Sequence, residues 1–331
     1  MTPPTAGPRP ADRYLLPLSW AGLAVGAAIL ASILSGALAG ATLPVMIGTS
    51  VTRTGMDVAG VACVGLTLLG TLLPQVRELP GGAVRDLNRV RATADRWLVL
   101  LAGGWLVVVI VGVMFRVASA FARPVSELNG TEVAAWATEL AAGRGMVLTA
   151  GCAAVVLGCG VVRLYDRDRL EVRVPMVAAL LGLITPAVTG HAGAAPDHQL
   201  AIITVGAHVG AAGLWVGGLA AMLVLVARHR PLLEAVLPRF SRLAGGCLLA
   251  ITLTGVVTAQ LRLQSWTALF TTGYGWLVLA KTGCLLLLAC LGALARRRLA
   301  TGRTPVLRWA ALETALMAAT LGLAAALSQA G

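Results

Sequence analysis

The sequence predicts an all-α polytopic membrane protein, built as a bundle of about nine transmembrane helices. The 331 residues are 58% hydrophobic and only 12% charged, whereas a soluble domain is roughly 45–50% apolar and about 25% charged. Apolar segments of about 20 residues, the length that spans a bilayer, recur along the whole chain. Arginines gather in alternate loops between these segments, a pattern typical of membrane topology.

In chain order, the predicted helices cover residues 14–38, 56–74, 97–121, 144–164, 173–191, 199–227, 239–260, 274–295 and 307–328. The first apolar run exceeds the 7–15 residues of a signal-peptide core, so we interpret it as a helix. Residues 75–96 are amphipathic and are predicted to lie along the cytoplasmic surface. No loop exceeds about 20 residues, too few for an independent core. Residues 1–130 (helices one to three) and 140–330 (helices four to nine) should therefore form one integrated bundle.

The arginines predict the orientation of the bundle. Twenty of the 25 arginines lie on one side of the predicted membrane. They precede the first helix, follow the eighth, or fall in the loops between helices two and three, four and five, and six and seven. The five on the opposite side are Arg53, Arg116, Arg123, Arg144 and Arg262. The positive-inside rule then places the N-terminus in the cytoplasm and the C-terminus outside. Because topology accounts for the net charge of +12, the lipid bilayer is the expected partner and nucleic acid is not.

Histidines supply the first candidate functional residues, because an ionisable side chain within a membrane span is costly. His208 is predicted near the midplane, and His191 and His198 lie in a short external loop. Imidazole binds copper, zinc and haem iron. His198 and His208 are ten residues apart, about 15 Å and 80° on one helix. They would share an ion only if the helix began after His198. We therefore favour His191 with His208 as a pair and His198 as an outer ligand, with a structural role for His208 as the alternative.

Further polar and soft side chains fall on the predicted helices. Lys281, the one lysine, lies seven residues after Tyr274 near the middle of helix eight, and Glu313 lies in helix nine. A Lys281–Glu313 pair would be structural or gating. Trp215 follows His208 on nearly the same helix face. The methionines near outer helix ends, Met46, Met56 and Met146, are candidate soft ligands for Cu(I) or ordinary apolar residues.

Taken together, these residues resemble the CopD (copper-resistance D) family of bacterial inner-membrane proteins over residues 140–330. The resemblance is carried by Gly190-His191-Ala192, His208, Leu214-Trp215-Val216-Gly217-Gly218-Leu219, Thr254-Gly255, Thr272, Tyr274-Gly275, Lys281 and Glu313. The Asp197-His198 pair is similar to the actinobacterial branch. Residues 1–130 match the family more weakly.

The resemblance implies copper transport across the bacterial cytoplasmic membrane, toward the cytoplasm. It makes His191 and His208 the candidate copper ligands, with His198 as a branch-specific addition. Cu(I) is favoured over Cu(II), and an extracytoplasmic copper-binding protein is an expected partner. No classical enzyme motif or Walker loop is found, so an enzyme is not expected.

Two other hypotheses stay open. One is a haem-binding membrane oxidoreductase or assembly factor, with His191 and His208 as axial ligands of haem b. The other is a non-transporting scaffold or sensor whose histidines are structural.

Overall fold

The computed structural model describes residues 43–79, 81–189, 198–262 and 267–271, and a few positions between 279 and 290. Every regular element in these ranges is helical. The α-helices are α2 (Leu43–Leu72), α3 (Gly81–Ala120), α4 (Gly130–Glu139), α5 (Ala141–Tyr165), α6 (Arg173–Val188), α7 (His198–Ala221), α8 (Arg230–Arg262) and α9 (Ala268–Thr271). Short turns of other helix types are η1 (Val76–Glu78), η2 (Val125–Glu127), η3 (Arg167–Arg169) and the π-helical η5 (Met222–Val226).

Five of these helices are long and apolar enough to cross a membrane: α2, α3, α5, α7 with η5, and α8. The predicted all-helical, multi-pass fold is therefore confirmed for this part of the chain. The predicted helices 14–38 and 307–328 lie outside the described residues, and 274–295 is described at a few positions only. The total of nine helices and the orientation of the termini stay predictions.

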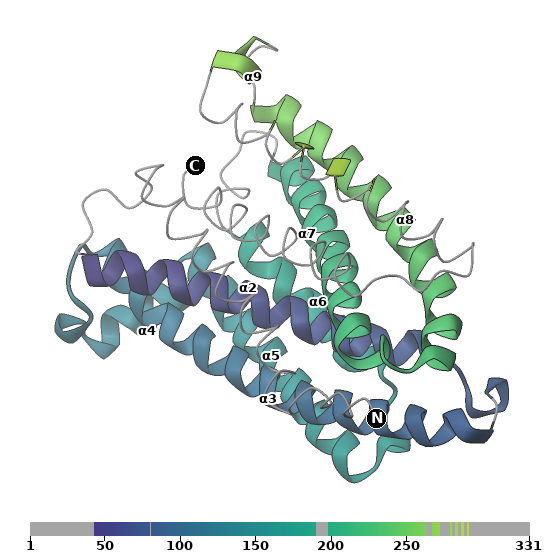
Figure 1. Ribbon diagram of the computed structural model, residues 1–331. Helices are drawn as coiled ribbons and strands as arrows, with labels where there is room; N and C mark the ends of the chain where they lie inside the picture. Colours follow the sequence, from purple (N-terminus) through teal and green to yellow (C-terminus); the bar gives the residue numbers. More distant parts are fainter. Residues whose placement is uncertain are drawn as a thin grey trace, which may run out of the picture.

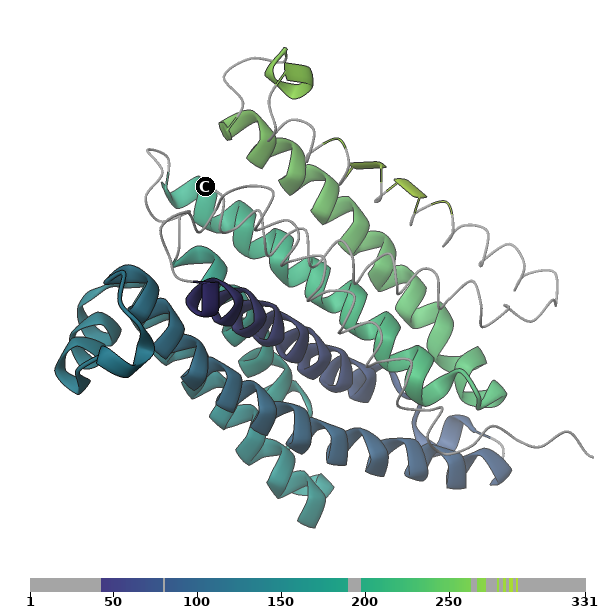
Figure 2. The ribbon, with the colours of Figure 1, turned by 60° about the vertical axis from the view of Figure 1, so that its left-hand side comes forward.

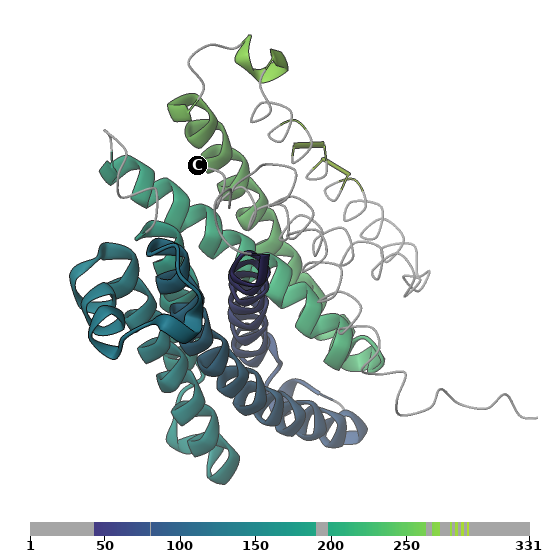
Figure 3. The same ribbon diagram turned by 90° about the vertical axis from the view of Figure 1, so that its left-hand side faces the viewer.

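Helix α2 lies at the centre of the bundle. It packs against α3, α6 and α7, while α5 packs on α3 and α8 packs on α7. Figure 1 shows α2 and α3 running side by side, with α7 and α8 running at an angle to them. In the turned view of Figure 2, α7 and α8 lie next to each other along most of their length. Figure 3 shows α2 between the α3/α5 pair and the α7/α8 pair.

Glycines allow α2 and α7 to approach at backbone distance. A Cβ atom on Gly217 of α7 would overlap the carbonyl oxygen of Val61 and lie 2.9 Å from the amide nitrogen of Gly65. A Cβ atom on Gly65 would overlap the carbonyl group of Gly217 in turn. Small residues at helix crossings are the usual means of close packing in membranes. The glycines that precede and follow Trp215 thus set the spacing of the bundle around α7.

The N-terminal end of α2 differs from the sequence expectation. The helix begins at Leu43 rather than near residue 56, so Arg53 is a buried helical residue and not a loop residue. Its Nε lies 3.2 Å from an Asp57 carboxylate oxygen one turn later. Threonine hydroxyls in the same stretch, such as those of Thr49 and Thr54, donate to carbonyls four residues earlier. A search for apolar runs misses such a segment because polar side chains lower its hydropathy. The helix tolerates them because they are paired within it.

Helix α3 also begins earlier than the apolar pattern indicates. Residues 81–96 continue without a break into the membrane span, giving a helix of 40 residues, about 60 Å long. This is about twice the thickness of the hydrocarbon core. Leu87 and Val90 in its first turns are buried, where α3 packs against η5 and α8. The amphipathic part of 75–96 is therefore mainly the packed N-terminal extension of α3.

Candidate functional site

His208 lies in the middle of α7 and faces α8. It is the eleventh residue of the helix, about 15 Å along the axis from His198. The ring is half-buried, and its Nδ1 lies 2.9 Å from the hydroxyl oxygen of Thr254 on α8. The neighbouring Gly255 leaves room for the ring, since a Cβ atom there would lie 3.9 Å from His208 Cε1. The structure thus joins two segments that the sequence noted separately, His208 and Thr254-Gly255.

The hydrogen bonds of Thr254 assign the tautomer of His208. The Thr254 hydroxyl lies 2.6 Å from the carbonyl oxygen of Ala250 and 3.2 Å from that of Ile251, so it donates its single hydrogen within its own helix. In the tautomer that fits this arrangement, Nδ1–H of His208 donates to the Thr254 oxygen. The neutral imidazole consequently carries its lone pair on Nε2. A group that holds one ring nitrogen in this way orients the other as a metal ligand.

The other predicted ligands are placed less fully. His191 lies outside the described residues, and for His198 only the backbone is described. Because α7 begins at His198 rather than after it, His198 and His208 are held about 15 Å and 80° apart on a single helix. The condition under which these two residues could share an ion is therefore not met.

Of the predicted pathway residues, Trp215 is buried in the core of the bundle. It lies seven residues after His208, two turns along the same face of α7. Tyr274, Lys281 and Glu313 lie outside the described residues. The structure thus leaves their gating role, and the Lys281–Glu313 pair, as predictions.

Two of the three candidate methionines meet beside Gly112 of α3. Met56 of α2 and Met146 of α5 are both buried. A Cβ atom on Gly112 would lie 3.4 Å from Met56 Sδ and 3.5 Å from Met146 Cε. Met46 is half-buried and lies ten residues before Met56 on α2, about 15 Å away along the helix. Met56 and Met146, called the Met56–Met146 pair below, therefore pack on the same glycine, and Met46 lies apart from them.

A charged cluster where the N-terminal half of α3 meets the C-terminal end of α5 was not predicted. Asp95 of α3 accepts from Arg163 Nε at 3.2 Å and from Arg167 Nε at 2.7 Å. The side chains of Asp95 and Arg163 are 7% and 9% exposed. Arg163 falls within the predicted helix 144–164, so its position inside an apolar segment was the available signal.

No group of three histidine, cysteine, aspartate or glutamate side chains that could hold a metal ion is found among the described residues. Of the predicted soft-metal ligands, the structure describes the side chains of His208, Met46, Met56 and Met146.

Two family models match the chain. The model described as "Copper resistance protein D-like, N-terminal domain" matches residues 46–199, and "Copper resistance protein D" matches residues 234–327. The chain belongs to the CopD family. The first match carries the family likeness into the N-terminal half, where the sequence alone showed it weakly, and it includes Met56 and Met146. The second match includes Thr254, Tyr274, Lys281 and Glu313. His208 and Trp215 lie in α7, between the two matched segments.

A curated relative of this CopD-family chain is "Copper transport protein CutJ" of Bacillus subtilis (strain 168). The two are 30% identical over 139 residues, which are 39% of this chain and 26% of the relative. The matched region thus spans about a quarter of the length of the relative. No solved structure matches the chain.

Proposed function

We propose that this protein carries copper ions inward across the bacterial cytoplasmic membrane, with His208 as a ligand inside the bundle. Family membership and the printed name of the Bacillus subtilis relative support copper as the transported substrate. The observation that carries the proposal for His208 is its hydrogen bond to Thr254. This bond directs the Nε2 lone pair as a metal ligand requires.

The ion would pass between ligands that replace its water one at a time. A copper ion cannot cross hydrocarbon with its hydration shell, and each ligand set must bind weakly enough to release it onward. His191 and His198 would receive the ion at the outer mouth, from an extracytoplasmic copper-binding protein. Thioethers and imidazoles together favour Cu(I) over Cu(II).

The Met56–Met146 pair would form a second soft contact, in the N-terminal half of the bundle. Both side chains are buried and reach the same glycine from different helices. The Met56 and Met146 side chains can adjust their three rotatable bonds to an ion without moving the backbone. Trp215, Tyr274, Lys281 and Glu313 would line or gate the pathway beyond His208.

The test is copper stoichiometry and an optical spectrum on the same purified sample, after loading with Cu(I) under reducing conditions. Wild type is compared with His208→Ala and with His229→Ala as the matched control. His229 pairs with Asp86 of α3, with Nδ1 3.2 Å from the carboxylate oxygen, and has no part in the proposed pathway. We expect copper binding to fall by at least about tenfold in His208→Ala and to persist in His229→Ala.

Other results would overturn this assignment. A Soret band that shifts on reduction and is lost in His208→Ala would identify haem b, with His208 as an axial ligand. Equal copper binding by wild type and both variants would remove His208 from the pathway and leave the imidazole with a structural role.

A further inference from the structure

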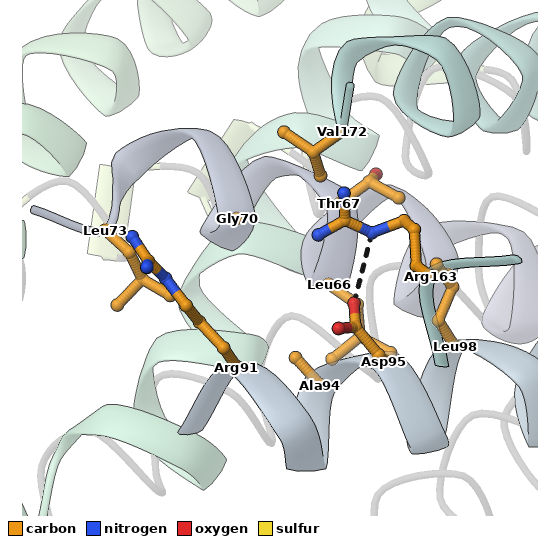
Figure 4. Close-up of a pocket in the computed structure, with 10 residues that line it drawn as sticks. All are labelled: Leu66, Thr67, Gly70, Leu73, Arg91, Ala94, Asp95, Leu98, Arg163 and Val172. Atoms are coloured by element: carbon orange, nitrogen blue, oxygen red, sulfur yellow. Dashed lines mark hydrogen bonds and ion pairs between the residues drawn. The ribbon is translucent and has the colours of Figure 1, made fainter. Parts of the chain in front are cut away.

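A small cavity opens between the C-terminal parts of α2 and α5 and the N-terminal half of α3, a region that the predicted orientation places toward the cytoplasm. Its volume is about 20 Å³, enough for one water-sized group. Figure 4 shows Arg91 on one side of this cavity and Arg163 with Asp95 on the other. Apolar side chains complete the wall, among them Leu66 and Leu98.

The cavity carries more positive charge than its own carboxylate neutralises. Asp95 engages Arg163 with one oxygen and Arg167 with the other. Arg91 is a third cation, whose Nη2 donates to the carbonyl oxygen of Pro74 at 3.1 Å. Even with Asp168, whose charge also attracts Arg91, three guanidinium groups meet two carboxylates. The set retains one unit of excess positive charge.

The arginine cluster is reachable from the membrane surface. The side chain of Arg167 is 32% exposed, although its partner Asp95 is buried. Beside it, Tyr165 ends α5 with 90% of its surface exposed and lines a second, open groove with Val162, Asp166 and Arg169. An exposed tyrosine next to arginine and apolar side chains is typical of the bilayer interface.

We propose that this cavity binds the phosphate group of an anionic phospholipid headgroup from the inner leaflet. Guanidinium groups match phosphate oxygens through paired N–H donors. Basic sites between transmembrane helices on the cytoplasmic side suit anionic lipid headgroups. The cavity admits one phosphate oxygen between Arg91 and the Asp95 cluster, while the rest of the headgroup lies outside it over Arg167. Free inorganic phosphate presents the same oxygens, so it is the competing source.

The test measures lipid retention by native mass spectrometry and the thermal unfolding midpoint of the full chain in detergent. The probes are phosphatidylglycerol, phosphatidylcholine and inorganic phosphate. The variant is Arg91→Gln, and the matched control is Arg89→Gln. Arg89 lies on the same helix with its side chain 66% exposed and pairs with Asp86. We expect phosphatidylglycerol to be retained over phosphatidylcholine, and retention to fall about fivefold in Arg91→Gln but not in Arg89→Gln.

Each outcome decides the proposal. If inorganic phosphate displaces phosphatidylglycerol and its binding also depends on Arg91, the cavity is a phosphate site whose ligand is free phosphate rather than a lipid. Equal retention of the two lipids, or equal losses in both variants, would overturn it. If Arg91→Gln does not fold, Arg167→Gln takes its place, because it preserves the Arg163–Asp95 pair. The site uses no copper ligand, so this test is independent of the proposed transport.

Discussion

Replacing Thr254 with valine tests whether α8 orients the imidazole of α7. The substitution keeps the shape of the side chain and removes the oxygen that accepts from His208 Nδ1–H at 2.9 Å. Loss of an outer hydrogen-bond partner of a ligating histidine typically weakens metal binding 10–100-fold. This range corresponds to about 1.4–2.8 kcal/mol. It agrees with the cost of about 1–3 kcal/mol for leaving a buried donor unsatisfied.

Thr252→Val is the matched control for this substitution. Thr252 lies on the same helix and donates to the carbonyl oxygen of Leu248 at 2.8 Å, as Thr254 does to that of Ala250. It is exposed and is two residues away, so it points to a different face of α8. Both variants lose the bond to their own helix, and only Thr254→Val loses the contact with His208. The difference between them isolates the effect on the imidazole.

The assay is competition for Cu(I) between the purified protein and a chromophoric chelator. Thr254→Val should bind about 10–100-fold more weakly than Thr252→Val. Equal affinities in the two variants would refute the argument that Thr254 orients His208. A stronger loss than in His208→Ala would also contradict it, because an orienting residue acts only through the ligand that it holds.

Two further predictions concern stability. Asp95→Asn should destabilise the protein by about 3–5 kcal/mol, because Asp95 is buried between two arginines. The control is Asp86→Asn, which should cost about 0–1 kcal/mol because the Asp86 side chain is 34% exposed. Similar thermal unfolding midpoints for the two variants would contradict this prediction. Gly217→Ala should lower the midpoint through overlap with the backbone of α2, at a cost of about 1–3 kcal/mol or more. Gly245→Ala is the control, since no atom lies within 4 Å of its added Cβ. An equal lowering of the midpoint in Gly217→Ala and Gly245→Ala would show that α2 and α7 separate at no cost.

The apolar pattern predicted those helices whose surroundings are apolar throughout. Residues 144–164 and 199–227 correspond closely to α5 and to α7 with η5. The beginnings of α2, α3 and α8 were misplaced, α8 starting at Arg230 rather than at residue 239, because hydropathy responds to the polarity of a side chain and not to whether it is paired. Arg53 pairs with Asp57 one turn later within α2, and buried Asp95 of α3 pairs with Arg163 of α5. Pairing across helices depends on which elements pack together, and no local pattern contains that information.

The candidate site was predictable to a similar extent. His208 could be identified because an ionisable residue is rare inside a span. Its partner Thr254 lies 46 residues away; Thr254-Gly255 was noted for the family resemblance, but nothing in the sequence indicated that its hydroxyl meets His208. Met56 and Met146 were noted among scattered methionines, but their meeting at Gly112 follows from the packing of three helices. Residue chemistry was therefore evident from the sequence, and residue proximity was not.

Four of the five arginines assigned to the outer face lie within helices: Arg53 in α2, Arg116 in α3, Arg144 in α5 and Arg262 in α8. Arginines assigned to the inner face, among them Arg91 of α3 and Arg163 of α5, are helical too, so the predicted orientation rests on the sequence pattern alone. In that orientation His198 lies at the outer surface, and Arg91 and Arg163 lie toward the inner one. Central helix α2 packs against both α3 and α7 and so separates the two proposed sites. Because they share no residue, His208→Ala should keep its preference for anionic lipid and Arg91→Gln should keep its copper. If either variant lost both properties, the sites would be coupled through α2, and its glycine crossing with α7 would be the element to examine.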